Sequence, residues 1–147
     1  MCGPAGSGKS TWISGDAEAG TSAVISRDKI RFSMVSEDES YFSKEKEVYA
    51  EFCKQIAQAI DAPWVETVYA DATHLTRKAR QQLLDNVLPQ TKTPIENIKI
   101  IPIVIYPQLE TILERNARRS GRARVPDTVI KNMYNDFQLP EYNEKYK

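Results

Sequence analysis

The feature that most constrains this chain is a glycine-rich run close to its first residue. Residues 3–10 match the pattern G-x-x-x-x-G-K-[ST] at every required position. Glycines in such a run let backbone N–H groups turn inward around phosphates, because side chains would obstruct them. A helix that follows directs its N-terminus at the same anion. We therefore expect a nucleotide-binding loop built from Gly3, Pro4, Ala5, Gly6, Ser7, Gly8, Lys9, Ser10 and Thr11.

Two side chains at the end of this run carry the predicted chemistry. Lys9 is a flexible point charge suited to the β- and γ-phosphates of ATP, and it is a predicted catalytic residue. Ser10 offers a hydroxyl ligand to Mg²⁺. The expected cofactors are therefore ATP and Mg²⁺. Kinases, GTPases and motor ATPases share this loop. The sequence has no N-K-x-D guanine-reading tetrad, and 147 residues are few for a motor ATPase, so a small kinase is favoured.

The remainder of the chain alternates apolar strands with amphipathic helices. We predict strands at residues 23–25, 65–70 and 98–105. Helices are predicted from the glycine-rich run to about residue 15, over residues 44–62 and 76–88, and from Pro107 and Pro126 onward. Residues 98–105 are nearly all β-branched, which is typical of a strand buried on both faces. Pro102 cannot donate to a ladder, so a bulge or an early strand end is expected there.

This alternation predicts an α/β fold, with a P-loop kinase-type parallel sheet flanked by helices. We expect a single domain over residues 1–147. The glycine-rich loop begins at residue 3, without the buried strand that normally precedes it, and no strand follows the final helix. We therefore expect the sheet to lack an edge strand at one or both termini.

Overall composition limits the classes of partner. Twenty basic and twenty acidic residues give a formal net charge of zero, so any affinity for nucleic acid must come from local charge. No apolar run approaches the roughly 20 residues that span a bilayer, so we expect no membrane partner and a cytoplasmic location. Cys2 and Cys53 are expected to be idle thiols. The oligomeric state is not indicated.

A charged pair follows the first predicted strand. Asp28 and Arg31 come directly after it, at the end of the sheet where ligands bind in parallel α/β folds. A carboxylate there can accept a proton from an attacking hydroxyl, and an arginine beside it can hold an acceptor phosphate. The alternative is a capping aspartate and a solvated arginine. Next to a phosphate loop, we favour Asp28 as catalytic and acceptor-binding and Arg31 as acceptor-binding.

Asp71 occupies the corresponding position after the strand at residues 65–70. An acidic residue there can bind the magnesium ion and its water shell. The alternative is the N-cap of the helix at residues 76–88, for which Thr73 and Thr76 are equally suited. We predict Asp71 and Ser10 as the metal ligands, and His74 as a supporting or surface residue.

An arginine-rich segment at about residues 115–125 is the last functional candidate. It holds five arginines in ten residues, including Arg115 and Arg119. Such a segment can close over ATP as a lid and stabilise transition-state charge. It can also contact the phosphates of a polynucleotide, or serve as a solvated basic helix end. We favour the lid, with Arg119 and Arg115 as catalytic residues and Arg119 also as an ATP ligand.

Together, these motifs resemble those of one family. The phosphate loop, Asp28-x-x-Arg31, Asp71-Ala72-Thr73 and the segment from Arg115-Asn116 to Val125-Pro126 occur in the order seen in bacteriophage-type polynucleotide 5′-hydroxyl kinases and their AAA-like ATP-binding bacterial relatives. The resemblance spans nearly the whole chain. In this family an asparagine usually stands where this chain has His74.

The resemblance implies a role for each matching position. Asp28 would be the general base on a 5′-hydroxyl, and Arg31 would hold the neighbouring phosphate. Arg119 would be the lid arginine at the phosphates of ATP, with Arg115 as the second candidate. The implied substrate is the 5′-hydroxyl end of DNA or RNA, in nucleic-acid repair.

Two other functions stay open. A small-molecule kinase of the same fold would also use Asp28 as its base, although a neutral acceptor needs no Arg31. A nucleotide-binding module without catalysis is the third possibility, and the intact set of Lys9, Ser10, Asp28 and Arg31 opposes it.

Overall fold

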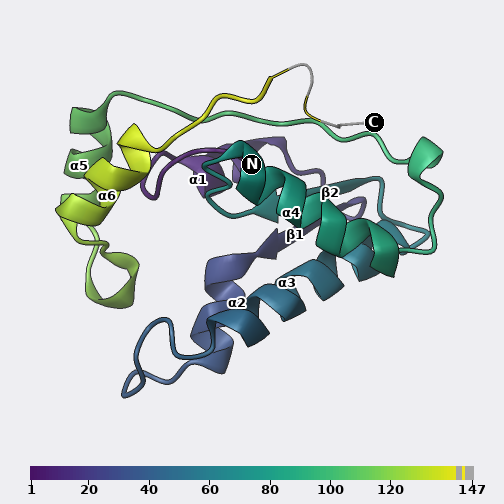
Figure 1. Ribbon diagram of the computed structural model, residues 1–147, viewed down its shortest axis with the longest axis horizontal. Helices are drawn as coiled ribbons and strands as arrows, with labels where there is room; N and C mark the ends of the chain where they lie inside the picture. Colours follow the sequence, from purple (N-terminus) through teal and green to yellow (C-terminus); the bar gives the residue numbers. More distant parts are fainter. Residues whose placement is uncertain (142–143, 145–147) are drawn as a thin grey trace.

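The computed structural model describes residues 1–141 and residue 144, and it has the α/β fold that the sequence predicts (Figure 1). The first half contains α1 (Lys9–Asp16), β1 (Ser22–Ser26), α2 (Arg27–Met34), α3 (Glu45–Ile60), β2 (Thr67–Asp71) and α4 (Arg77–Val87). The second half contains η1 (Leu88–Gln90), η2 (Ile95–Asn97), α5 (Leu109–Ala117), η3 (Gly121–Ala123) and α6 (Asp127–Asn135). The helices predicted at residues 44–62 and 76–88 are thus confirmed as α3 and α4.

Strands β1 and β2 lie side by side and run parallel. Their register pairs Ser22 with Thr67 at one end and Ser26 with Asp71 at the other. Because the two strands end at the same edge, the segments after Ser26 and Asp71 meet there. The pairing therefore brings Asp28 and Asp71 to one side of the sheet.

Residues 1–3 continue the sheet beyond β2. The N–H of Gly3 donates to the carbonyl oxygen of Thr73 at 2.9 Å, just past the end of β2. On the opposite side, the N–H of Cys2 donates to Ile103 (2.8 Å), and the N–H of Ile105 donates to Cys2 (2.9 Å). Residues 1–3 are therefore held between β2 and residues 103–105, directly before the phosphate loop.

The strand predicted over residues 98–105 is wrong in extent and in burial. In the described part of the chain, this segment is extended but pairs only through the bridge of Val104 with Cys2. Ile101 is 58% exposed, so the segment is not buried on both faces. β-branched residues favour an extended backbone, but a ladder also needs a neighbouring strand. Cys2 is the only such neighbour along this segment within the described residues.

The main core lies between α3 and the sheet. The apolar face of α3 buries Val48, Phe52 and Ile56, and Ile25 of β1 and Val68 of β2 pack against them. Each such fully buried side chain contributes roughly 1.5–3 kcal/mol to folding. The opposite face of β2 meets α1, where the Trp12 and Tyr69 rings make an edge contact at 6.4 Å. The face of the sheet toward α3 is therefore covered, and α1 covers β2 on the other face, where Val24 of β1 is 41% exposed.

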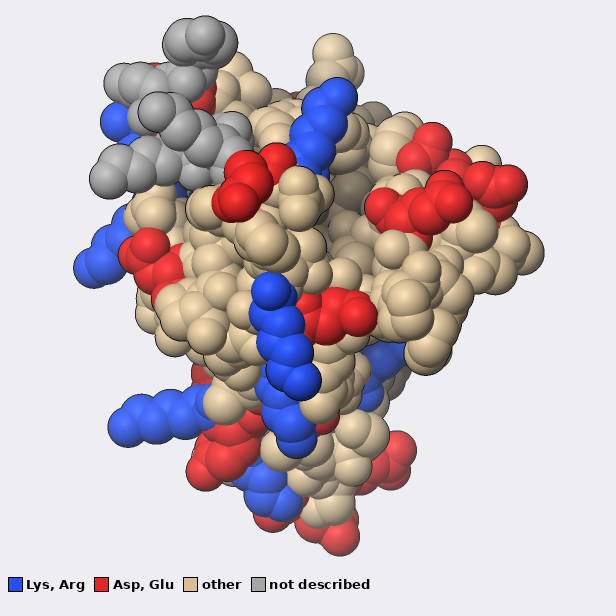
Figure 2. Space-filling model, turned by 90° about the vertical axis from the view of Figure 1, so that its right-hand side faces the viewer, with Lys and Arg blue, Asp and Glu red and all other residues tan. Residues whose placement is uncertain are grey.

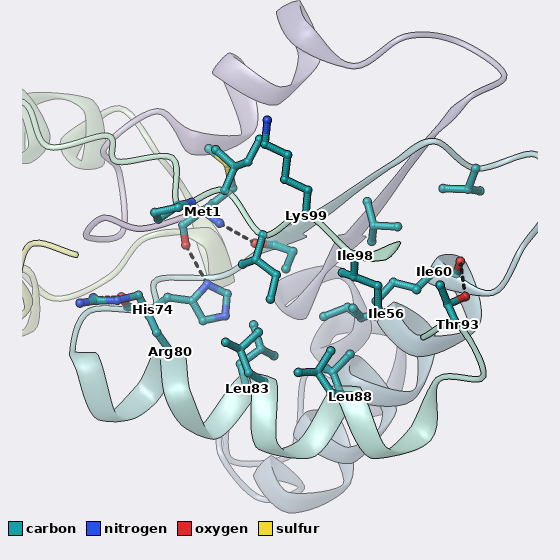
Figure 3. A pocket seen from close by; sticks show the side chains of 18 of the residues that line it. Met1, Ile56, Ile60, His74, Arg80, Leu83, Leu88, Thr93, Ile98 and Lys99 are labelled. Atoms are coloured by element: carbon teal, nitrogen blue, oxygen red, sulfur yellow. Dashed lines mark hydrogen bonds between the residues drawn. The ribbon is translucent and has the colours of Figure 1, made fainter. Parts of the chain in front are cut away.

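A cavity of about 310 Å³ with both apolar and polar lining residues lies beside β2. Val68 lines one side and residues 98–102 the other, and Figure 3 shows Leu83 and Leu88 pointing into it. Its lining includes no residue from Gly3 to Thr11, and neither Asp28 nor Asp71. The cavity is therefore separate from the predicted phosphate site. Cys2 and Cys53 are both buried free thiols, as expected.

Candidate active site

The glycine-rich run folds into a loop that leads straight into α1. Gly8 is the N-cap of α1 with φ 105°, a left-handed conformation that glycine adopts without strain, and no side chain caps the helix. At the start of the loop, a Cβ on Gly3 would lie 2.2 Å from the carbonyl oxygen of Ile105, so only glycine fits. The uncapped N–H groups of the first turn are free to bind an anion. The loop therefore fits the phosphates of a nucleotide.

Lys9 lies buried at the centre of this loop. Its ammonium donates to the carbonyl oxygens of Pro4 (2.7 Å) and Gly3 (3.0 Å). Burial lowers the pKa of Lys9 to about 8, and the charges of Asp71 and Asp28 oppose this shift. The charge of Arg119 lowers the pKa further. The ammonium of Lys9 is therefore sensitive to the charges of two predicted carboxylates and of one predicted lid arginine.

Ser10 and Asp71 meet directly, although the sequence separates them widely. The Ser10 hydroxyl, in the first turn of α1, donates to Asp71 Oδ2 at 2.8 Å. The N-cap of α4 is Thr76, whose Oγ1 accepts from the N–H of Ala79 at 3.1 Å. The alternative assignment of Asp71 as that cap is therefore wrong. A hydroxyl and a carboxylate beside a phosphate loop form the type of oxygen-donor set that Mg²⁺ takes together with nucleotide phosphates.

Asp28 stands in the first turn of α2 with its side chain 67% exposed. The N-cap of α2 is Ser26, whose hydroxyl accepts from the N–H of Lys29, so Asp28 does not cap the helix. Its Oδ1 accepts hydrogen bonds from Arg31 Nη1 at 2.6 Å and from the Tyr41 hydroxyl at 3.1 Å. The carboxylate is thus oriented by two donors and remains open to solvent.

Arg31 is far less accessible than a solvated arginine would be. It is 5% exposed, and its Nη2 and Nε both donate to Glu45 Oε2, at 2.8 and 3.3 Å. Its Nη1 contacts both Asp28 and Tyr41. Two carboxylates thus already share its charge, a fact that the sequence motif does not reveal.

The predicted lid forms the connection between α5 and α6. Asn116 is fully buried, and its amide nitrogen donates to the carbonyl oxygen of Val125 at 2.6 Å. Its amide oxygen accepts from the N–H of Val125 at 3.0 Å. Asn116 therefore closes the base of the loop that carries the arginines between these residues. Figure 1 shows this connection at the same end of the molecule as the connection between α2 and α3.

Three arginines of this segment make three different contacts. Arg115 Nη1 donates to the carbonyl oxygen of Ser7 at 2.8 Å, so Arg115 supports the phosphate loop. Arg119 is exposed and makes a long contact, 3.4 Å, with the carbonyl oxygen of Ala123. Arg122 reaches across to α2 and donates to the carbonyl oxygen of Val35 at 2.7 Å.

Sequence reasoning assigned no role to three residues at this site, namely Tyr41, Glu45 and Asn116. Tyr41 and Glu45 are far from Asp28 in the sequence, and no pattern links them to it. Asn116 lies within the arginine motif, so its position signalled importance, but its function as a loop clamp depends on a contact nine residues away.

Charged side chains of both signs lie on the face seen from the right-hand side of Figure 1. Figure 2 shows basic and acidic side chains interspersed over its lower part and a group of acidic side chains at its upper right. Within the described residues, no helix is long and apolar enough to cross a membrane, and no group of three or more His, Cys, Asp or Glu side chains could hold a metal by itself.

Comparison with known proteins identifies a family for this chain. A family model described as an AAA domain matches residues 1–140. Neither the curated proteins nor the solved structures contain a significant match. The match to the family model covers nearly the whole chain, including the phosphate loop, Asp28, Asp71 and the arginine segment. The chain therefore belongs to the AAA domain family and is a P-loop nucleotide-binding protein of the kinase type.

Proposed function

We propose that this protein is an ATP-dependent kinase that transfers the γ-phosphate to the 5′-hydroxyl end of a polynucleotide, DNA or RNA. The observation that carries this proposal is the Asp28–Arg31 pair at the open end of β1. It combines an exposed carboxylate with an arginine at 2.6 Å, and the charge of Asp28 acts on Lys9 in the phosphate loop. In this proposal the pair supplies the base and the phosphate-binding group, and the glycine-rich loop holds the nucleotide.

Each residue has a definite part in the proposed reaction. The N–H groups of the loop and the Lys9 ammonium would bind the phosphates of ATP, and Ser10 and Asp71 would hold Mg²⁺. The metal supplies charge neutralisation on the transferring phosphoryl group. The oxygen of the acceptor hydroxyl forms a bond to the γ-phosphorus, and Asp28 accepts the proton of that hydroxyl. The bond between the γ-phosphorus and the oxygen that bridges it to the β-phosphate breaks, and ADP leaves. Arg119 stabilises the charge that develops on the transferring group.

Arg31 would hold the phosphate on the 3′ side of the first nucleotide. Its Nη1 now donates to Asp28, so an acceptor phosphate would take over that donor while Glu45 keeps Nη2 and Nε. Loss of a donated hydrogen bond makes a carboxylate a stronger base. Phosphate binding would therefore prepare Asp28 for proton transfer.

One observation favours a second candidate, a small-molecule kinase. Arg31 is buried, and its charge is already shared by Asp28 and Glu45, so it could serve only to orient Asp28. In that case the acceptor would need no phosphate.

The deciding experiment compares a nucleoside 3′-phosphate with the plain nucleoside as acceptors of labelled phosphate. A charge-assisted contact contributes roughly 1.5–3 kcal/mol, so the phosphorylated acceptor should have a kcat/KM about tenfold to a hundredfold higher. Arg31→Ala should remove most of that preference, while Asp28→Asn should slow both acceptors alike. The matched control is Arg27→Ala, because Arg27 also pairs with Glu45.

Equal use of both acceptors by the wild-type protein would exclude the polynucleotide assignment and favour the small-molecule kinase. Equal slowing of both acceptors by Arg31→Ala would do the same, since it would show Arg31 acting only through Asp28. No transfer to either acceptor or to oligonucleotides, with ATP binding intact, would indicate a non-catalytic nucleotide-binding module.

A further inference from the structure

A cluster of aromatic rings lies next to Asp28, and only the hydroxyl of Tyr41 has a part in the proposed phosphate transfer, as a donor that orients Asp28. Phe32 and Tyr41 meet edge to face with centroids 6.3 Å apart, and Tyr41 meets Phe42 in the same way at 4.9 Å. The rings come from α2 and from the connection between α2 and α3. We call Phe32, Tyr41 and Phe42 the aromatic platform.

Two arginines lie against this platform. The guanidinium carbon of Arg31 is 4.7 Å from the Tyr41 ring centroid and 5.6 Å from that of Phe42. Arg122, from the arginine-rich segment, lies 4.8 Å from the Phe32 centroid. Two segments far apart in sequence therefore supply positive charge to the same group of rings.

The platform is open to solvent. Phe42 is 65% exposed and Phe32 is 38% exposed, although both side chains are apolar. Three acidic residues, Glu37, Asp38 and Glu39, belong to the same connection, and only Glu39 is seen paired, with Lys44, in the described chain. Their negative charge opposes phosphate binding at residues 37–39, so phosphates would have to lie at Arg31 and Arg122. A neutral, flat, aromatic group suits the exposed rings better.

We propose that the aromatic platform binds the nucleobase of the 5′-terminal nucleotide on an unpaired acceptor strand by stacking, an inference that rests on the proposed function. Single-strand-binding proteins use exposed aromatic rings next to arginines in this way, and the stacking tolerates any base. Phe42 supplies the most accessible ring, while Arg31 and Arg122 supply charge for the flanking phosphates.

The aromatic platform is directly connected to the proposed catalytic carboxylate. The Tyr41 hydroxyl donates to Asp28 Oδ1 at 3.1 Å, so one side chain links the rings to the carboxylate that would deprotonate the acceptor. In a nucleotide, the base and the 5′-hydroxyl are attached to the same sugar. One terminal nucleotide can therefore reach both Asp28 and the platform, provided that its base is not held in a duplex. This requirement selects single-stranded or overhanging 5′ ends over blunt duplex ends.

The test measures binding directly, without ATP, by fluorescence anisotropy of labelled single-stranded oligonucleotides that carry a 5′-hydroxyl. One oligonucleotide has a normal 5′-terminal nucleotide, and the other has an abasic sugar at that position with the same hydroxyl and phosphates. Wild-type protein should bind the base-bearing strand about tenfold more tightly, which corresponds to about 1.4 kcal/mol. Phe42→Leu should reduce that preference to about twofold or less, and Phe42→Trp should retain it.

Trp64→Leu is the matched control. Trp64 is another exposed aromatic residue, at 68%, but it precedes β2 and so lies at the end of the sheet away from Asp71. Its replacement should leave the preference unchanged. Phe42 is exposed, so Phe42→Leu should also retain the wild-type Tm.

Equal affinity of wild-type protein for the two strands would overturn the proposal, as would an unchanged preference in Phe42→Leu. The experiments can also distinguish failure of the nucleobase site from failure of the proposed kinase activity. If the base-dependent binding is found but no acceptor is phosphorylated, the platform stands as a nucleobase site and the transfer reaction does not. If phosphate is transferred equally well to base-bearing and abasic ends, the kinase stands and the platform does not.

Discussion

Arg115 Nη1 donates a hydrogen bond to the carbonyl oxygen of Ser7 across 2.8 Å and so fastens α5 to the phosphate loop. Arg119, only one helical turn later, makes no comparable contact with the loop among the described residues. The two arginines that the sequence left as alternatives for one role are thus in different situations, and we predict different effects of replacing them.

Arg115→Ala should loosen the phosphate loop before any chemistry takes place. A hydrogen bond from a side chain that is largely exposed contributes about 1 kcal/mol, so we expect ATP to bind roughly fivefold more weakly and Tm to fall slightly. Calorimetry and thermal denaturation measure both effects. An unchanged ATP affinity, with only kcat reduced, would show that Arg115 acts in the transition state.

Arg119→Ala should leave Tm and ATP affinity nearly unchanged and lower kcat by at least tenfold, because its contact would form mainly as charge develops. The matched control is Arg124→Ala, an exposed arginine of the same segment, which should retain wild-type kcat. If Arg119→Ala instead raises only the acceptor KM, the segment contacts nucleic acid and is not a catalytic lid.

Lys9→Met should separate stability from activity. Burial lowers the pKa of Lys9 to about 8, which shows that the folded protein disfavours the charged ammonium. Removing that charge should keep or raise Tm in the absence of nucleotide. The transition state should nonetheless lose on the order of 3 kcal/mol or more of stabilisation, because the charge compensation for the phosphates is lost. The rate of phosphate transfer should fall accordingly. ATP turnover at the wild-type rate would exclude the phosphate-loop assignment.

His74→Asn should make the protein less sensitive to acid. His74 has φ 42°, a left-handed conformation that asparagine tolerates better than most residues. Burial lowers the pKa of His74 to about 3, whereas an unfolded histidine titrates near its ordinary value of about 6.5. The unfolded chain thus binds the extra proton between those values. The free energy of unfolding should therefore fall as pH drops from about 6.5 to 3, by up to about 1.4 kcal/mol per pH unit.

Thermal or urea denaturation of both proteins at several pH values between 7 and 4 measures this effect. Carboxylates contribute equally to both pH profiles, so the difference between the profiles reports His74. His74→Asn should show the shallower decline. Parallel profiles would mean that the imidazole does not stay neutral in the folded protein.

The sequence predicted those parts of the fold and site that depend on local pattern. Helix periodicity located α3 and α4 to within about two residues, and the rule that ligands gather where parallel strands end placed Asp28 and Asp71 together. The Ser10–Asp71 contact follows from that rule and from the start of α1 in the loop.

Contacts that depend on tertiary packing were beyond sequence reasoning. The run at residues 98–105 indicated an extended backbone but could not indicate how few neighbours it would have. The burial of Arg31 depends on Glu45, which belongs to another helix. His74 was expected to be a supporting or surface residue. It is buried, which excludes the surface alternative, and its Nδ1 bonds to the carbonyl oxygen of Met1. In each case, the deciding partner is far away in the sequence.

The clamping of residues 1–3 between Thr73 and residues 103–105 has a consequence for the order of folding. β1, α2, α3, β2 and α4 are continuous in the sequence and share one core, so they can associate early. The phosphate loop gains its backbone partners only when residues 103–105 and Arg115, 108 residues after Ser7, have arrived. Contacts of such long sequence separation form slowly. Nucleotide affinity should therefore appear as a late phase in refolding, after most of the helical signal has recovered.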